Sequence, residues 1–343
     1  MPKPSAIRRY RTLDAHAAGE PLRLIVEGYP APKGRTMLEK RAWVKRHADG
    51  IRRALMLEPR GHADMYGAVL TEPVSEGADA GVLFMHNEGY STMCGHGIVA
   101  VTTMAVERGL IHPREPNRIA YDSPAGPVHA RAHTSEREGG GGRSVRVDRV
   151  SFDNVPSFVF APGLPIRAAG RDLRVDVAFG GAFYAIVDAE AAGLPVAPAK
   201  LPELRRVGME IKHAVEAAVT VVHPQDKGLN GIYGTIFTGP ADRSDADLKN
   251  VTIFADAEVD RSPCGTGTCA VMAVVDAMGL MPKDRPFGHE SIIGTLFNGR
   301  ITGRTRVGEF DAILPELEGS AWITGEHVFL VDDEDPLQAG FRL

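Results

Sequence analysis

The sequence predicts an α+β fold of two pseudo-symmetric α/β halves, each with a sheet wrapped round a central helix. Two observations carry this prediction. A glycine-rich segment that begins with cysteine occurs twice, once in each half of the chain, and most other apolar runs are short, rich in Val, Ile and Phe, and interrupted by Gly and Pro. Runs of that kind are typical of strands, and a repeated segment indicates duplicated halves.

The expected elements can be placed in order along the chain. Apolar residues with helical spacing predict one helix over 43–55 and another over 204–215, each covering a sheet with one face. Four consecutive glycines, Gly139 to Gly142, are flanked by charged residues, which predicts an exposed hairpin or loop. Short apolar runs predict strands over 143–147, 173–178, 183–187, 217–222 and 251–254.

The repeated segment predicts two more helices, each starting beside a cysteine. Cys94 begins CGHGIVAVTTMAVERGLI, and Cys264 begins CGTGTCAVMAVVDAMGLM. Both segments are apolar nearly all round, so each helix should be buried on all sides at the centre of its own half. Gly109 and Gly279 are the expected C-terminal caps, because glycine adopts the left-handed backbone that ends many helices.

The repeat also predicts two domains. The first covers residues 1–160 and carries Cys94, and residues 326–343 are expected to return to it. The second covers residues 161–325 and carries Cys264. The boundary is placed in the segment from Asn154 to Gly170, which is rich in Pro and Gly.

Composition narrows the class of protein. The chain has 343 residues, of which 43% are hydrophobic and 24% charged, as in ordinary globular proteins. A net charge of −5 with interleaved signs predicts no nucleic-acid partner and no membrane partner, which favours a small-molecule substrate. The segment from Met1 to Arg11 has no apolar stretch behind its basic residues, so we expect a cytoplasmic protein. Three scattered cysteines predict reduced thiols.

The positions of Cys94 and Cys264 favour acid–base chemistry. A helix N-terminus carries partial positive charge and unpaired N–H groups, so it should lower the pKa of a thiol and bind a carboxylate. Removing the α-proton of an amino acid without pyridoxal phosphate depends on donors aimed at that carboxylate. Inversion also needs one group to take the proton and a second to return one to the opposite face, which two thiols can do. His96 and Asp260 lie close enough in sequence to contact the substrate amine or to tune the thiols, although each could instead make only local hydrogen bonds.

These motifs resemble the two signatures of the proline racemase family. They are Met93–Gly97 and Asp260–Thr268, and supporting segments extend over most of the chain: 14–16, 19–23, 58–62, 155–158 and 179–185. The resemblance implies a diaminopimelate epimerase-like fold with the site between the halves. It also implies a homodimer that uses no cofactor and no metal.

The resemblance assigns roles residue by residue. It implies that Cys94 and Cys264 are the acid–base pair, and that His96 and Asp260 meet the ring nitrogen of proline or hydroxyproline. The residues implied to bind the substrate carboxylate are Gly95, His96, Gly265 and Thr266.

The family includes proline racemases, 4-hydroxyproline 2-epimerases and trans-3-hydroxy-L-proline dehydratases. The dehydratases usually carry Thr where this chain has Cys264, so Cys264 favours racemisation or epimerisation. However, the segments Asn87–Thr92 and Ile232–Phe237 are more similar to the dehydratase branch, which keeps dehydration as an alternative. An alternative of another class is a non-catalytic protein that binds a small molecule in the same cleft.

Overall fold

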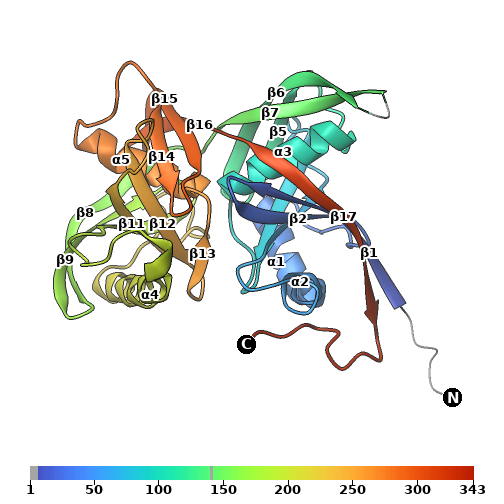
Figure 1. Ribbon diagram of the computed structural model, residues 1–343, viewed down its shortest axis with the longest axis horizontal. Helices are drawn as coiled ribbons and strands as arrows, with labels where there is room; N and C mark the ends of the chain where they lie inside the picture. The colour runs from blue at the N-terminus through green and yellow to red at the C-terminus, as the bar shows by residue number, and fades with distance from the viewer. Residues whose placement is uncertain (1–6, 140–141) are drawn as a thin grey trace.

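The computed structural model describes residues 7–139 and 142–343. Part of the N-terminal segment from Met1 to Arg11, and Gly140 and Gly141 of the four-glycine stretch, lie outside the described residues. Figure 1 shows two halves side by side, each containing one of the two predicted central helices. Within the described residues, none of the helices combines the length and the apolar character needed to cross a membrane.

The N-terminal half is a sheet in the order β17-β1-β2-β3-β4-β5-β6-β7. Two of its pairings are parallel, β2 with β3 and β4 with β5, and a helical connection precedes the second strand of each pair. The strands are β1 (Ile7–Ala17), β2 (Glu20–Glu27), β3 (Tyr66–Thr71), β4 (Ala80–His86), β5 (Arg118–Ser123), β6 (Gly126–Gly139), β7 (Gly142–Asp153) and β17 (Ala321–Asp332). The helices are α1 (Met37–His47), α2 (Asp49–Met56) and α3 (Gly95–Arg108).

The C-terminal half repeats this topology in the order β8-β9-β10-β11-β12-β14-β15-β16. Its parallel pairings, β10 with β11 and β12 with β14, occupy the equivalent places, and β16 pairs with β8 to close the sheet. The strands are β8 (Ser157–Ala168), β9 (Arg171–Phe179), β10 (Phe183–Asp188), β11 (Gly234–Pro240), β12 (Leu248–Phe254), β13 (Glu258–Asp260), β14 (Phe287–Ser291), β15 (Leu296–Val307) and β16 (Phe310–Gly319). The helical segments are η1 (Pro198–Lys200), α4 (Leu201–Ala218) and α5 (Gly265–Ala277).

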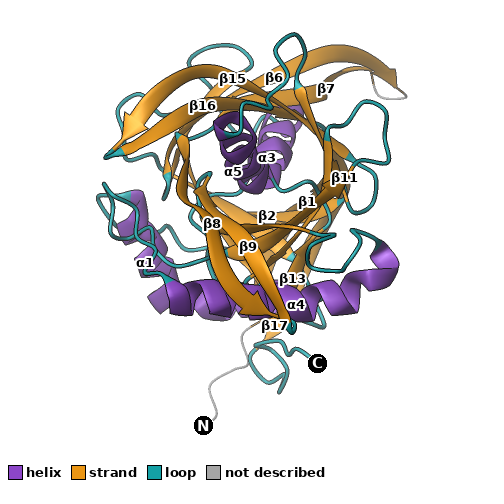
Figure 2. Cartoon of the chain, turned by 90° about the vertical axis from the view of Figure 1, so that its left-hand side faces the viewer, coloured by secondary structure: helices purple, strands orange, loops and turns teal. Residues whose placement is uncertain are grey.

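Helices α3 and α5 lie inside the two sheets, as Figure 2 shows from the end of the molecule. Every residue of α3 from Gly95 to Ala105 is buried, and so is every residue of α5 from Gly265 to Val274. The prediction of two helices buried on all sides is therefore confirmed. Gly109 caps α3 with φ 63°, and Gly279 follows α5 with φ 73°, the left-handed backbone expected at both ends.

Two of the predicted elements are wrong. The helix expected over 43–55 is two helices that meet at Ala48, and the weak helix formers Asp49 and Gly50 follow this break. The strand expected over 217–222 is not formed, because α4 continues to Ala218 and only Val222 makes an isolated bridge, to Asn230.

The division between the halves can be described from strand pairing. Residue 160 lies within β8, which pairs with β9 and β16 of the C-terminal half. The strand that returns to the N-terminal half is β17, which begins at Ala321 and pairs with β1. We propose that the halves divide between β7 and β8, and again between β16 and β17.

Candidate active site

The N-termini of the two central helices meet at a pair of glycines. A Cβ atom added to Gly95 would lie 2.4 Å from the Cα atom of Gly265, and one added to Gly265 would lie 2.3 Å from the Cα atom of Gly95. Any side chain at either position would push the helices apart. The first-turn N–H groups of a helix have no carbonyl partners within that helix, so this contact gathers two sets of anion-binding donors in one place.

Cys94 is the N-cap residue of α3. Its backbone is extended, with φ −148°, and its sulfur accepts a hydrogen bond of 3.2 Å from the backbone N–H of Gly97. The imidazole of His96 lies beside the sulfur, with Nδ1 at 3.2 Å. Burial lowers the pKa of His96, which keeps the ring neutral at physiological pH.

Cys264 begins α5 with a different backbone. Its φ is 63°, a left-handed conformation that is costly for a residue with a Cβ atom. Hydrogen bonds of the neighbouring backbone hold Cys264 in this conformation. Its N–H donates to Ser262 Oγ at 3.1 Å. The carbonyl of the preceding residue, Pro263, accepts from Asn250 at 2.8 Å and from Thr268 at 3.1 Å.

The sulfur of Cys264 faces hydroxyl groups. The hydroxyl of Tyr184, from β10, lies 3.6 Å from this sulfur and 2.6 Å from Oγ1 of Thr266, and Thr266 Oγ1 is itself 4.0 Å from the sulfur. A hydrogen bond from the Tyr66 hydroxyl likewise lowers the pKa of Cys94. Cys94 differs in having the imidazole of His96 beside its sulfur as well.

Asp260 lies at the end of β13. Its negative charge raises the pKa of both Cys94 and Cys264. Its Oδ1 accepts hydrogen bonds from the backbone N–H and the hydroxyl of Ser262. Its other oxygen, Oδ2, lies 3.8 Å from Nδ1 of His96, beyond hydrogen-bonding distance.

The seven residues singled out from the sequence therefore lie together, and the structure corrects the expected pKa of the two thiols. The sequence predicts that the helix N-termini lower it. Cys94 and Cys264 are instead only 4% and 6% exposed, and burial, the largest cause, raises the pKa of Cys94 well above its ordinary range and that of Cys264 to about 12. The Gly97 N–H offsets this only in part at Cys94, because desolvation of a buried thiolate outweighs one hydrogen bond.

Besides Tyr184, sequence reasoning missed three further hydroxyl groups near the thiols. Tyr66 begins β3, Ser91 lies before α3, and Tyr233 directly precedes β11. Tyr66 OH hydrogen bonds to Ser91 Oγ and lies 3.3 Å from Tyr233 OH. Ser91 and Tyr233 also line a cavity of about 460 Å³ between the halves. A second repeat could have revealed the tyrosines, since Tyr66-Gly67 and Tyr233-Gly234 stand at equivalent strand starts.

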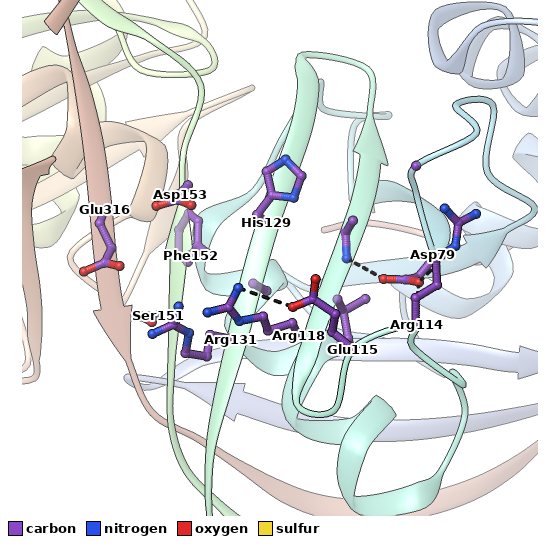
Figure 3. Close-up of a pocket in the computed structure, with 14 residues that line it drawn as sticks. Asp79, Arg114, Glu115, Arg118, His129, Arg131, Ser151, Phe152, Asp153 and Glu316 are labelled. Atoms are coloured by element: carbon purple, nitrogen blue, oxygen red, sulfur yellow. Dashed lines mark hydrogen bonds and ion pairs between the residues drawn. The ribbon is translucent and has the colours of Figure 1, made fainter. Parts of the chain in front are cut away.

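Figure 3 shows another pocket, of about 440 Å³, on the outside of β5, β6 and β7. Its charged side chains largely pair with one another: Arg118 with Glu115 at 3.3 Å, and Arg114 with Asp79 at 4.0 Å. The predicted site residues line neither this pocket nor the cavity of about 460 Å³, but that cavity includes Ser91 and Tyr233, which neighbour Tyr66 beside His96. The convergence of helix ends, thiols and a buried carboxylate therefore makes the cleft between the halves the stronger candidate.

Across residues 7–139 and 142–343, no group of three or more His, Cys, Asp or Glu side chains is arranged to hold a metal ion.

Comparisons with known proteins agree with this geometry. A family model described as "Proline racemase" matches residues 12–342. The chain is 49% identical over 335 residues to a trans-3-hydroxy-L-proline dehydratase of Bacillus cereus, covering 97% of this chain and 98% of that protein. It is 43% identical over 336 residues to a 3-hydroxyproline 2-epimerase of Burkholderia multivorans, with the same two coverages.

Among solved structures, the chain is similar to a hydroxyproline epimerase from Agrobacterium vitis with bound trans-4-hydroxy-L-proline. The TM-score is 0.88 at 31% identity, covering 98% of this chain and 95% of that one. A PhzF-family protein of Bacillus anthracis shares the fold at 13% identity with a TM-score of 0.54, covering 94% of this chain and 99% of that one. The predicted α+β fold of two halves is confirmed.

Proposed function

Because this chain belongs to the proline racemase family, we propose that it inverts the α-carbon of a hydroxyproline by exchanging protons through Cys94 and Cys264. The single observation that supports this most is the contact between Gly95 and Gly265, which brings the starts of α3 and α5 together with a cysteine at each. Inversion needs a proton acceptor and a proton donor on opposite faces of one carbon. Two thiols supply both functions.

The substrate carboxylate is proposed to bind where the helices meet. The backbone N–H groups of Gly95, His96, Gly265 and Thr266 lie in the first turns of α3 and α5, where helix geometry leaves such groups without carbonyl partners. As the α-proton leaves, negative charge moves from the carbon into the carboxylate. Donors already aimed at that carboxylate stabilise the transition state more than the ground state.

The ring nitrogen is proposed to bind at Asp260 and His96. A protonated secondary amine needs a negative or neutral acceptor, and Oδ2 of the buried Asp260 carboxylate lies 3.8 Å from Nδ1 of His96. The lowered pKa of His96 keeps its ring free to accept a hydrogen bond from the amine. The positive amine would also offset the negative charge of Asp260, which otherwise raises the pKa of both thiols.

The proton transfers then balance without a cofactor. One sulfur, as the thiolate, takes the α-proton and becomes a thiol. The other, as a thiol, gives its proton to the opposite face and becomes a thiolate. The enzyme ends with the two protonation states exchanged and can act on the opposite isomer. The raised pKa of Cys264 makes its thiolate a strong base once it has formed, and Tyr184 is positioned to stabilise that thiolate with a hydrogen bond.

The relatives support trans-3-hydroxy-L-proline as the substrate. Proteins named for this compound are 43–49% identical to the chain, while the structure that holds trans-4-hydroxy-L-proline is 31% identical. The names also favour a second candidate function, dehydration. Both reactions begin with removal of the α-proton. In inversion, a second thiol then returns a proton to the carbon. In dehydration, the 3-hydroxyl takes up a proton and leaves as water, which gives a cyclic enamine that tautomerises to the imine.

One experiment separates the candidates. Purified protein is incubated in D₂O with trans-3-hydroxy-L-proline, trans-4-hydroxy-L-proline or L-proline, and NMR follows the deuterated epimer and the cyclic imine. Inversion predicts the epimer, and Cys264→Thr should lower its rate by several orders of magnitude, because a hydroxyl is a far weaker base. If the imine forms and survives that substitution, dehydration is correct. Cys269→Ala is the control, since Cys269 is a buried thiol deeper in α5.

Absence of both products and of deuterium exchange would favour the non-catalytic binding protein instead. The homodimer also stays a prediction, and the mass of the protein in solution at micromolar concentration checks it. The cytoplasmic location and the lack of nucleic-acid partners are likewise predictions of the sequence alone.

A further inference from the structure

A buried group of hydroxyls joins the two halves next to the thiols. This hydroxyl cluster consists of Tyr66, Ser91 and Tyr233. The two phenols come from opposite halves and occupy equivalent places, because Gly67 pairs with Arg23 on parallel strands as Gly234 pairs with Tyr184. Their hydroxyls lie 3.3 Å apart, and Tyr66 also hydrogen bonds to Ser91.

The cluster lies on the path between the thiols and the cavity. Tyr66 and Ser91 are 3% and 4% exposed, and Ser91 and Tyr233 line the cavity of about 460 Å³. On the inner side, the ring of Tyr66 packs edge-on against His96 with centroids 4.8 Å apart. The ring of Tyr233 packs edge-on against Tyr184, the neighbour of Cys264, at 5.8 Å.

The charges of the sulfurs also affect the pKa values of the two phenols. Negative charge on either Cys94 or Cys264 raises the pKa of Tyr233, and negative charge on Cys94 raises that of Tyr66, in addition to the larger effect of burial. If the substrate carboxylate binds at the helix N-termini and its α-carbon lies between the sulfurs, the ring must extend away from the helix ends. Towards the cavity, this ring would meet the hydroxyl cluster, among the polar side chains that lie there.

The chemistry of the cluster matches a ring hydroxyl. Each hydroxyl can donate one hydrogen bond and accept others, so the cluster can both give a hydrogen bond to a substrate oxygen and receive one from its proton. A site that hydrogen bonds a substrate hydroxyl discriminates strongly against the analogue without it, because buried polar groups then lose their partner. The methylene of proline offers no such partner.

We propose that the hydroxyl cluster of Tyr66, Ser91 and Tyr233 binds the ring hydroxyl of the substrate and sets the preference for hydroxyproline over proline. This inference rests on the proposed function, and it adds the residues that determine specificity. In the alternative reaction, the same cluster would hold the hydroxyl that leaves with a proton. The prediction about preference is therefore the same for epimerisation and dehydration.

The test compares substrates on the same variants. We expect Tyr233→Phe to lower the ratio of kcat/KM for trans-3-hydroxy-L-proline to kcat/KM for L-proline by about tenfold or more, the value of one or two hydrogen bonds. Ser91→Ala, a smaller change, should shift the same ratio in the same direction. Tyr121→Phe is the matched control, because Tyr121 is a buried tyrosine whose hydroxyl bonds to another hydroxyl, Thr102, at 3.2 Å outside the site.

Inhibition by pyrrole-2-carboxylate gives a second readout. This planar anion has the ring and the carboxylate but no ring hydroxyl, so its inhibition constant should be the same for the wild type and Tyr233→Phe. An active wild type whose substrate ratio is unchanged in both variants would overturn the inference and leave the proposed function standing. Equal losses for proline, hydroxyproline and pyrrole-2-carboxylate would also overturn it, since they indicate a general packing role. A wild type that neither exchanges nor converts any of the rings would overturn both proposals.

Discussion

Replacing Gly95 by alanine tests whether the meeting of the two helix ends is what makes the site work. The new Cβ atom would lie 2.4 Å from the Cα atom of Gly265. Favourable carbon–carbon contacts are about 3.5–4.0 Å, so the starts of α3 and α5 must separate by about 1 Å. The obstacle is backbone, which cannot swing aside as the end of a flexible side chain can. Cys94 and Cys264 would move apart with their helices.

The expected loss follows from that displacement. A misplacement of about 1 Å in reacting groups can cost about a hundredfold in rate, so kcat for inversion should fall by about that factor. Overpacking a buried position also costs about 1–3 kcal/mol, so the free energy of unfolding should decrease measurably while the fold is kept. Gly265→Ala should behave in the same way, because its Cβ would lie 2.3 Å from the Cα atom of Gly95.

The assay is the rate of inversion with saturating substrate, followed by polarimetry, together with urea denaturation of each variant. Gly50→Ala is the control: Gly50 lies in the first turn of α2, and a Cβ there would meet nothing within 4 Å. That variant should keep full activity and gain about 0.5–1 kcal/mol of stability. A Gly95→Ala variant with wild-type kcat would refute the idea that the contact between helix ends positions the thiols.

Three further predictions concern stability. Burial raises the pKa of Cys264 to about 12, whereas an unfolded thiol has a pKa of about 8.5, so the folded protein keeps a proton that the unfolded chain loses. The stability that comes from burying the neutral thiol is complete below about pH 8.5 and falls by about 1.4 kcal/mol per pH unit above it. Urea denaturation between pH 8 and 10 should therefore show a shallower decline in the free energy of unfolding for Cys264→Ala than for the wild type. The hydroxyl of Thr268 lies 2.8 Å from Nδ1 of the buried imidazole of His289. Thr268→Val removes this partner and should lower the free energy of unfolding, measured by thermal denaturation, by about 1–3 kcal/mol, whereas Thr268→Ser keeps a hydroxyl and should lower it much less. Arg205→Met removes the ion pair between α4 and the buried carboxylate of Asp64 in the N-terminal half, and it should lower the free energy of unfolding by about 1–3 kcal/mol. Arg206→Met breaks a surface ion pair within α4 and should change the free energy of unfolding by no more than about 0.5 kcal/mol. Equal effects of the two substitutions would contradict a stabilising link between the halves.

The parts of the site that repeat in sequence could be predicted from sequence. Cys94 and Cys264 each begin a Cys-Gly-x-Gly segment followed by an apolar run, and such a run can only be a buried helix with the cysteine at its start. Gly95 and Gly265 in these segments are required for a reason that their secondary-structure propensities do not express. Gly95 and Gly265 are needed because two backbones touch there, a contact that joins distant segments and that no local rule expresses.

The remaining residues of the site depend on tertiary packing. Tyr66 and Tyr233 come together only because each half places the start of an equivalent strand at the cleft, and a lone tyrosine in a sequence gives no sign of that. The pKa of the two thiols was predicted in the wrong direction for a related reason. The helix N-terminus can be inferred from local sequence, but burial depends on everything that packs around the sulfur, and burial is the larger effect.

The two thiols occupy equivalent positions in the repeat, yet the structure makes them chemically different. Cys94 is a regular helix N-cap, with a backbone donor and an imidazole at its sulfur. Cys264 has a left-handed backbone, and a phenol is its close neighbour. The repeat nevertheless gives both sulfurs the same types of partner. Hydrogen bonds from the Tyr66 hydroxyl and the Gly97 N–H lower the pKa of Cys94, and hydrogen bonds from the Tyr184 hydroxyl and the Gly267 N–H lower that of Cys264. The duplication therefore preserves the donors at each sulfur, while the left-handed backbone of Cys264 and the imidazole beside Cys94 are features of one half each.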